Sequence, residues 1–271
     1  MALIQTFVPI YRAADGTALR YIMQAMAHAS AAGHQIVASS YGGALVDDAR
    51  NGAVGQCMSN VDFLLFIDDD MKPEPDAISK IVALNRPIAS ALCTTRSEPV
   101  KLSLSEWEEK ERRFKTWDTY APTRVIEGQY GVGAAFLCVR MDALMQVVDY
   151  YLTAHDWLEW NRPMLDRLKV RAELREQERE RKESLRRMFM QKRGLLRLFE
   201  HMVYDSELNM GEDLAFCWKA IQCGITVTID PTIRVGHKGD KDYYVEDYVA
   251  PQHVKNFVHT PESLGIKELI A

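Results

Sequence analysis

The 271-residue sequence lacks three features that are typical of membrane, secreted and nucleic-acid-binding proteins. Its longest uninterrupted run of large apolar residues is Phe63–Ile67, whereas a membrane-spanning helix needs about 20 apolar residues. No basic segment, apolar stretch and cleavage pattern follow one another near its start, so no secretory signal is visible. Positive charge is not in excess, since 33 Lys and Arg stand against 38 Asp and Glu, which argues against a general nucleic-acid binder.

Cysteine is scarce, and its spacing suits neither a disulfide framework nor a zinc site. The five cysteines are odd in number, scattered, and contain no Cys-x-x-Cys pair, so we interpret them as buried free thiols and expect a cytoplasmic protein. The sequence also lacks a Gly-x-Gly-x-x-Gly motif and a P-loop lysine, which leaves Rossmann dehydrogenases and P-loop kinases without support.

Strand-like and helix-like segments alternate over the first 93 residues. Strands are predicted at 3–10, 35–40, 61–67 and 87–93, and helices at 17–32, 45–57 and 75–84. This alternation predicts an α/β fold with a mostly parallel sheet flanked by helices, which binds ligands at the carboxyl ends of its strands. Further along we expect a long loop at 94–127, strands at 131–140 and 225–229, and helices at 141–152 and 210–223.

One segment differs in charge from the rest of the chain. Residues 166–200 carry 12 Lys and Arg against 7 Asp and Glu, whereas the remainder is strongly acidic. We therefore divide the chain into a first part of one domain at 1–154, a basic helical insertion at 155–205, and a return to the first domain at 206–271. The insertion is interpreted as a solvated, salt-bridged helix, or as a surface for an anionic membrane, a partner or a second copy of the chain.

Three consecutive carboxylates, Asp68, Asp69 and Asp70, directly follow the strand predicted at 61–67. Carboxylates this close raise one another's pKa, and a divalent cation compensates them because hard oxygen ligands suit Mg²⁺ or Mn²⁺. Asp68 and Asp70 alternate along an extended chain, so both can approach one ion. The alternative is an acidic loop that caps the helix near Pro75, but a position after a central strand favours the metal site.

An apolar strand ending in Asp-x-Asp resembles the metal-binding motif of GT-A-fold nucleotide-sugar glycosyltransferases of the family 2 type. Four further segments resemble motifs of this family in the same order: Asp48-Ala-Arg50-Asn51, Gly131-Val-Gly133, Gly211-Glu-Asp213 and Val235-Gly-His237. The resemblance covers roughly residues 3–150 and 205–240. It implies a GT-A-like fold and a hexosyltransferase that moves a sugar from a UDP- or GDP-sugar to an acceptor hydroxyl, with Mn²⁺ or Mg²⁺ as cofactor.

The resemblance also implies roles for individual residues. His237 would complete a metal site begun by Asp68 and Asp70. Asp213 would act as the catalytic base that deprotonates the acceptor, with Glu212 orienting the acceptor. The residues implied to contact the nucleotide-sugar are Pro9, Tyr11, Arg12, Ser39, Arg50, Asn51, Asp68, Asp69, Gly131, Gly133 and Lys238.

Each of these side chains also has an ordinary structural explanation. Glu212 and Asp213 open a predicted helix, where acids complement the helix dipole and cap free amides. A single histidine such as His237 is usually an ordinary polar residue, and Arg50 could pair with a neighbouring aspartate. The two glycines could form only a strand bulge.

Several functions compete with an inverting, non-processive transferase. Retention of configuration is the main mechanistic alternative. A nucleotidyltransferase that makes nucleotide sugars normally carries a glycine-rich basic loop after its first strand, which residues 7–14 lack, and a non-catalytic module would not need both acidic motifs. A processive synthase would carry Gln-x-x-Arg-Trp, but Gln222 is followed by Cys-Gly-Ile-Thr. The acceptor stays open among a glycan, a lipid-linked sugar, a protein and a modified nucleic-acid base.

Overall fold

The computed structural model describes residues 1–10, 15–42, 45–57, 61–96, 98–118, 121–153, 197–203, 209–239 and 241–248. Of the basic insertion predicted at 155–205, the described residues include only 197–203, so its helical character and its partners stay predictions. None of the helices in the described ranges combines the length and hydrophobicity needed to cross a membrane.

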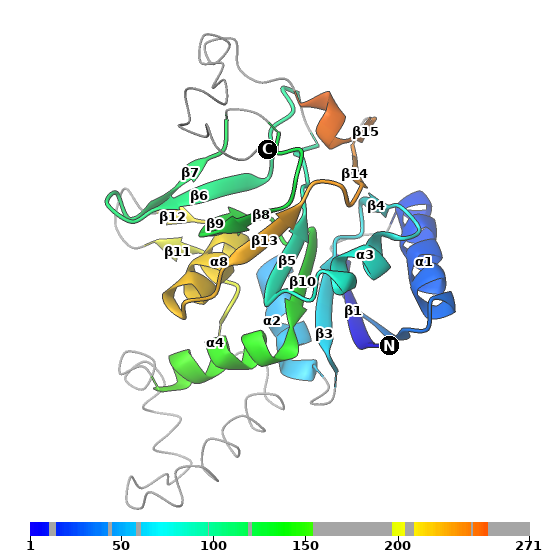
Figure 1. The fold of residues 1–271 in the computed structure, drawn as a ribbon, viewed down its shortest axis with the longest axis horizontal. Helices are drawn as coiled ribbons and strands as arrows, with labels where there is room; N and C mark the ends of the chain where they lie inside the picture. Colours follow the sequence, from blue (N-terminus) through cyan, green and yellow to red (C-terminus); the bar gives the residue numbers. More distant parts are fainter. Residues whose placement is uncertain are drawn as a thin grey trace, which may run out of the picture.

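Seven strands form the central sheet in the spatial order β2-β1-β3-β10-β5-β13-β8 (Figure 1). Their bounds are β1 Leu3–Ile10, β2 Gln35–Gly42, β3 Phe63–Ile67, β5 Ile88–Ala91, β8 Ile126–Gly128, β10 Phe136–Arg140 and β13 Val227–Asp230. Strand β1 pairs in parallel with β2 and β3, and β5 pairs in parallel with β13. Strand β10 runs antiparallel to β3 and β5, and β8 runs antiparallel to β13. The predicted α/β class with a largely parallel sheet is confirmed.

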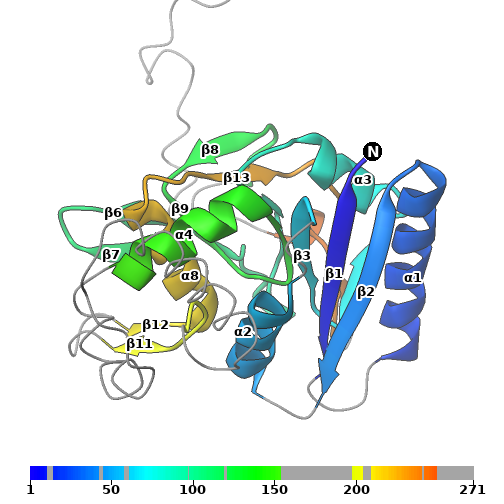
Figure 2. The ribbon, with the colours of Figure 1, turned by 90° about the horizontal axis from the view of Figure 1, so that it is seen from below.

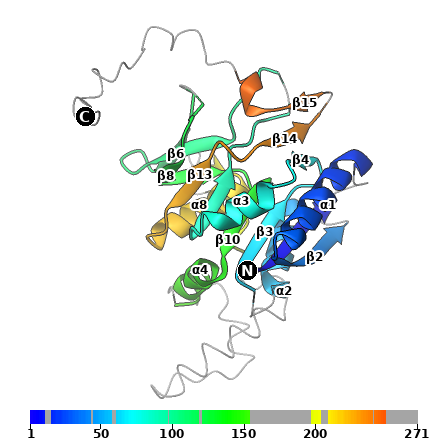
Figure 3. The same ribbon diagram turned by 45° about the vertical axis from the view of Figure 1, so that its right-hand side comes forward.

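Helices cover both faces of this sheet (Figures 2 and 3). Helices α1 (Gly16–Ala31) and α3 (Ala77–Ala83) pack on one face, and α2 (Val46–Gln56), α4 (Met141–Thr153) and α8 (Glu212–Gln222) pack on the other. In β3, Leu64 and Phe66 belong to the core under α2, α4 and α8, whereas Leu65 and Ile67 belong to the core under α1 and α3. Because successive strand residues point to opposite faces, a strand buried on both faces is apolar throughout.

Three smaller sheets surround the carboxyl ends of the central strands. Strand β4 (Met71–Pro73) pairs with β14 (Val235–Lys238), which pairs with β15 (Asp242–Tyr243); a short 3₁₀ helix, η1, spans Val245–Asp247. Strand β6 (Leu104–Glu108) lies between β7 (Arg113–Thr116) and β9 (Tyr130–Val132), and β11 (Met202–Val203) pairs with β12 (Asn209–Met210). The β6–β7 hairpin lies within the segment expected to be a long loop with short elements.

The single strand predicted at 131–140 is wrong. Its two halves belong to different sheets, because β9 pairs with β6 whereas β10 lies in the central sheet. Between them, the Ala135 carbonyl accepts a hydrogen bond from the Asp68 N–H (3.0 Å). This turn places Gly133 beside the start of α8. The break in the strand therefore lies at the same edge of the sheet as the acidic triplet.

The cysteines are free thiols, as expected. Cys57, Cys93, Cys138 and Cys217 are buried and Cys223 is partly buried. Burial raises the pKa of the Cys138 thiol to about 12, so these side chains act as small apolar core residues.

Substitutions at two glycines test this packing, and we expect them to change the free energy of unfolding in opposite directions. A Cβ on Gly131 would lie 2.6 Å from Leu214 Cδ2 and 2.8 Å from Phe114 Cε1, whereas one on Gly52 would meet nothing within 4 Å. We expect Gly131→Ala to lower the free energy of unfolding by about 1–3 kcal/mol through overpacking. Gly52→Ala, inside α2, should raise it by about 0.5–1 kcal/mol. Urea unfolding followed by circular dichroism measures both, and an unchanged midpoint for Gly131→Ala would contradict the packing of β9 on α8.

Candidate functional site

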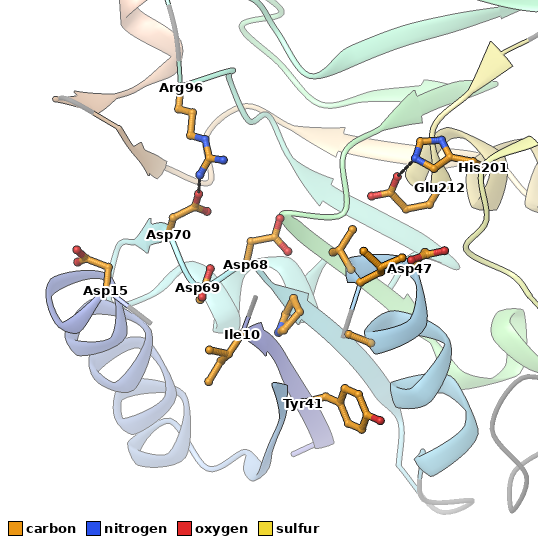
Figure 4. Close-up of a pocket in the computed structure, with 14 residues that line it drawn as sticks. Ile10, Asp15, Tyr41, Asp47, Asp68, Asp69, Asp70, Arg96, His201 and Glu212 are labelled. Carbon is orange, nitrogen blue, oxygen red and sulfur yellow. Dashed lines mark hydrogen bonds and ion pairs between the residues drawn. The ribbon is translucent and has the colours of Figure 1, made fainter. Parts of the chain in front are cut away.

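A cavity of about 730 Å³ lies at the carboxyl ends of β1, β2 and β3 (Figure 4). Its size is within the range of about 300–1,000 Å³ that is typical of small-molecule sites. It is lined by Pro9, Ile10, Asp15, Tyr41, Leu45, Val46, Asp47, Ala49, Asp68, Asp69, Asp70, Arg96, His201 and Glu212. Six of these lining residues are acidic, and Arg96 alone among them carries a permanent positive charge. The lining therefore suits a cation, or an anion that arrives with one.

His237 reaches Asp70 because β14 pairs with β4. In this pairing His237 lies opposite Met71, and the Lys238 N–H donates to the Asp70 carbonyl (2.9 Å). His237 Nδ1 lies 2.7 Å from the Thr94 carbonyl oxygen and donates to it, since a carbonyl can only accept. His237 Nε2 is thereby left facing Asp70 Oδ2 at 3.3 Å.

A neutral imidazole nitrogen and a carboxylate oxygen are both acceptors, so a proton or a cation must lie between them. Burial lowers the pKa of His237, but the hydrogen bonds with Asp70 and Thr94 outweigh burial and raise it overall. Burial, together with the charges of Asp70 and Asp68, raises the pKa of Asp69. The exposed Arg96 guanidinium also contacts Asp70 (Figure 4).

The three predicted metal ligands are not brought together. Asp70 and His237 face each other, but Asp68 is turned toward Arg50. Over the described ranges, no group of three or more His, Cys, Asp or Glu side chains gathers in a way that could hold a metal ion. The physical reason is competition, because a buried guanidinium occupies both oxygens of Asp68.

Arg50 is 2% exposed and connects three carboxylates. Its Nη2 donates to both oxygens of Asp68 (2.9 and 3.1 Å), and its Nη1 donates to Glu212 Oε1 (3.0 Å) and to Asp213. Burial lowers the pKa of Arg50, but the charges of the three acids raise it well above its ordinary value. Arg50 does not line the cavity, and its terminal nitrogens are directed at the protein's own carboxylates.

The alternative for Arg50, a pair with Asp47 or Asp48, is also wrong. Both of these aspartates accept from Arg197 Nη2, each at 2.8 Å. Arg50 therefore pairs with acids of other elements, at the end of β3 and the start of α8, and not with its neighbours on α2.

Glu212 and Asp213 open α8, but their side chains face Arg50. The N-cap residue is Gly211, which supplies no side-chain hydrogen bond. Burial raises the pKa of Asp213 to about 6, although Arg50 opposes this shift. A carboxylate with a pKa near neutrality is well matched to accept a proton from a substrate. Glu212 lines the cavity, and its Oε2 lies 3.8 Å from His201 Nε2.

Asn51 holds a segment of the chain in place. Its Nδ2 donates to the Phe199 carbonyl (2.6 Å), and its Oδ1 accepts from the Phe199 N–H (3.0 Å). The buried Lys219 of α8 holds the same segment, residues 197–200, through two backbone carbonyls. These contacts bring His201 to the cavity. Both polar ends of the Asn51 amide are used on the Phe199 backbone, and Asn51 is not among the residues that line the cavity.

Of the residues predicted to lie near the nucleobase, the structure describes only some. Pro9 lines the cavity and lies opposite Tyr41 in the parallel register of β1 and β2. Ser39 is two residues short of this edge, and its hydroxyl donates to a backbone carbonyl of β1 (3.1 Å). Tyr11 and Arg12 lie outside the described residues.

The two predicted glycines have different surroundings. Gly131 packs against Leu214 and Phe114, away from the cavity lining. Gly133 is next to the acids, because a Cβ there would lie 3.6 Å from Asp213 Oδ2. The close neighbour of Gly133 is Ser103, whose Oγ would lie 2.6 Å from such a Cβ and accepts a hydrogen bond from the Gly133 N–H (3.1 Å).

Lys238 lies at the rim, where its Nζ donates to Asp15 Oδ2 (2.7 Å). Asp15 lines the cavity and caps α1 by accepting from the N–H groups of Thr17 and Ala18 (2.9 Å each). The hydrogen bond from Lys238, with these backbone bonds, lowers the pKa of Asp15 to about 2.

A scan of protein-family models finds none that matches the sequence. A search of curated proteins also finds no match. Solved structures with some similarity include the catalytic domain of Drosophila beta1,4galactosyltransferase 7 in complex with xylobiose, at 11% identity and a TM-score of 0.42, covering 97% of this chain and 73% of that one. Another is 4-diphosphocytidyl-2C-methyl-D-erythritol synthase from Anaerococcus prevotii, at 8% identity and a TM-score of 0.33, covering 57% and 78%. A third is a glycosyltransferase involved in the glycosylation of the major capsid of PBCV-1, at 12% identity and a TM-score of 0.31, covering 57% and 69%. At these levels of similarity, the function has to be inferred from the chain's own residues.

Among the lining residues with polar side chains, sequence reasoning missed five: Asp15, Tyr41, Asp47, Arg96 and His201. Tyr41 and Arg96 follow predicted strands within a few residues, and the carboxyl ends of parallel strands meet at one edge, so a signal for them was present. His201 carries no local signal, because contacts with residues far away in the sequence bring it to the cavity.

The Asn51 contact can be tested through stability. Asn51→Leu leaves the buried N–H and C=O of Phe199 without partners, and each unpaired group costs about 1–3 kcal/mol. We therefore expect the free energy of unfolding in urea to fall by at least about 2 kcal/mol. The control is Gln146→Leu, which removes an exposed amide bond to the Cys223 carbonyl and should change stability by about 0.5 kcal/mol or less. Equal stability of both variants would mean that the Asn51 amide does not fix the segment.

Proposed function

We propose that this chain is a metal-dependent, non-processive glycosyltransferase that moves a sugar from a nucleotide-sugar to an acceptor hydroxyl with inversion. The observation that carries the proposal is that the acids after β3 and Glu212, the first residue of α8, line one cavity, and that Arg50 holds Asp213 beside them, although the two groups are far apart in the sequence. The first group suits a cation-bound diphosphate, and the second suits a base for the acceptor. A binding module would need only one of them.

The cation would be Mn²⁺ or Mg²⁺, held by Asp70 and His237. Such ions are commonly bound by one or two protein side chains together with substrate phosphates and water. The proton on His237 Nδ1 is fixed by Thr94, which leaves Nε2 free to ligate, as is usual for metal-binding histidines. When bound, the ion would neutralise negative charge on the departing diphosphate. Arg96 would then release Asp70 and become available to a phosphate.

The reaction would be a single substitution at the anomeric carbon. The acceptor oxygen forms a bond to that carbon, the bond from the carbon to the diphosphate oxygen breaks, and the acceptor proton passes to the Asp213 carboxylate. Glu212, which lines the cavity, would orient the acceptor. A retaining reaction would not need Asp213 as a base, so the two mechanisms make different predictions for this residue.

The donor would lie along the edge formed by β1, β2 and the acidic triplet. Pro9 and Tyr41 would border the nucleobase of a UDP- or GDP-sugar, with Asp69 and Lys238 closer to its ribose or phosphates. Tyr11 and Arg12 are included in this proposal only because the resemblance implies them.

Metal dependence can be tested by calorimetry with UDP and GDP. We expect binding that requires Mn²⁺ or Mg²⁺ and that weakens at least about tenfold in Asp70→Asn, because the variant removes a charged ligand. Asp76→Asn, at the residue before α3 and outside the cavity lining, serves as the control and should bind as the wild type does. Undiminished nucleotide binding in EDTA would contradict the role assigned to the ion.

The role of Asp213 can be tested by kinetics. Asp213→Asn should lower kcat by about 10²–10⁴-fold, the usual contribution of general base catalysis, and change donor affinity little. Since the base must be unprotonated, wild-type kcat should rise with pH through the Asp213 pKa of about 6, and the variant should lose this limb. Near-normal turnover in a folded Asp213→Asn variant, or a product that retains configuration, would remove Asp213 from the chemistry.

A further inference from the structure

We infer that Arg50 is a positioning residue that couples the donor side of the site to the base, and that it is not a nucleotide ligand. This inference rests on the proposed function. Its starting point is that one guanidinium from α2 bridges Asp68, at the end of β3, and Asp213, at the start of α8. A single side chain therefore ties together two acidic motifs that are far apart in the sequence.

The geometry excludes a direct contact with a ligand. Arg50 is 2% exposed, and its terminal nitrogens all point at carboxylates. A nucleotide phosphate would have to displace Asp68, Glu212 or Asp213 to reach them. The arginine therefore lies beneath the cavity and acts through the acids above it.

Charge explains why the bridge is needed. Asp68, Glu212 and Asp213 are all less than about one third exposed, and carboxylates held together out of water repel one another. One buried guanidinium satisfies all three because its planar fork offers several donors in fixed directions. A lysine ammonium is a compact point charge, so it can keep the charge balance but cannot bridge the same atoms.

An aromatic group fixes the arginine from below. The Arg50 guanidinium carbon lies 5.9 Å from the centre of the Phe199 ring. Phe199 stacks on Phe216 of α8 (4.6 Å, 11° between planes) and meets Phe66 of β3 edge-on (5.2 Å). The strand, the helix and the arginine therefore all contact the Phe199 ring, so Arg50 holds Asp68 and Asp213 from a fixed position in the core.

The test compares Arg50→Lys with Arg140→Lys. Arg140 also forms a two-point pair with an aspartate, Asp142 (2.6 and 2.9 Å), but at the surface beside α4. We expect Arg50→Lys to lower kcat about a hundredfold, the scale of a misplacement of about 1 Å, while calorimetric affinity for UDP or GDP with Mn²⁺ changes less than about threefold. Arg140→Lys should leave both quantities unchanged.

A double variant separates positioning from general damage. If Arg50 acts through Asp213, adding Asp213→Asn to Arg50→Lys should lower kcat by much less than Asp213→Asn does alone, because groups that act as a unit are not additive. Full additivity would overturn the inference. A large loss of nucleotide affinity with kcat preserved would also overturn it, since it would make Arg50 a ligand.

Amide hydrogen exchange gives a readout that does not depend on activity. Arg50→Lys should speed exchange at least about fivefold in peptides covering 211–218 and 68–71, and leave α1 unchanged, because a segment opens more often once the side chain that holds it is replaced. Equal acceleration throughout the chain, or none, would contradict coupling by Arg50. If the wild type neither binds nor hydrolyses any nucleotide-sugar, the proposed function fails, and this exchange pattern still decides whether Arg50 joins the two acidic segments.

Discussion

The structure around the cavity depends on compensating negative charge at the carboxyl end of β3. A strand that is buried on both faces delivers three aspartates to one point, and each requires a proton, a cation or a basic side chain. Arg50 compensates Asp68, whereas His237 and Arg96 share Asp70. Helix α8, strand β14 and helix α2 all approach this point, and each contributes a charged or titratable side chain to it. The surrounding fold can be understood as the scaffold that brings these side chains together.

Much of the fold could be predicted from local pattern. The run Phe63–Ile67 alternates between two cores, so its continuous hydrophobicity correctly identified a central strand. The segment 131–140 shows the limit of this reasoning. Its apolar residues suit a strand throughout, but β9 pairs with β6 and β10 with the central sheet, and between them Gly133 packs closely against Ser103. The partners on the two sides of the break are distant in the sequence, so no local pattern contained it.

In the candidate site, too, the sequence predicts which residues matter but not which partners they contact. The motifs pointed to residues that lie close together, since Asp68, Asp70 and Glu212 line one cavity and His237 contacts Asp70. They did not give the pairing, because Arg50 and Asn51 satisfy buried carboxylates and a buried backbone that belong to other elements. Choosing among the partners of a buried donor requires knowing every acceptor within reach, and this depends on tertiary structure.

The anchoring of residues 197–200 has a consequence for how this protein can change over time. Asn51 and Lys219 bind backbone atoms of this segment, so these hydrogen bonds do not depend on which side chains it carries. Its side chains are held separately: Leu198 and Phe199 are buried, Arg197 pairs with Asp47 and Asp48, and Glu200 pairs with Lys219. A substitution within residues 197–200 therefore acts through the side-chain contacts, while the backbone hydrogen bonds to α2 and α8 are kept. Evolution can thus change what this segment presents toward the cavity without changing the path of its main chain.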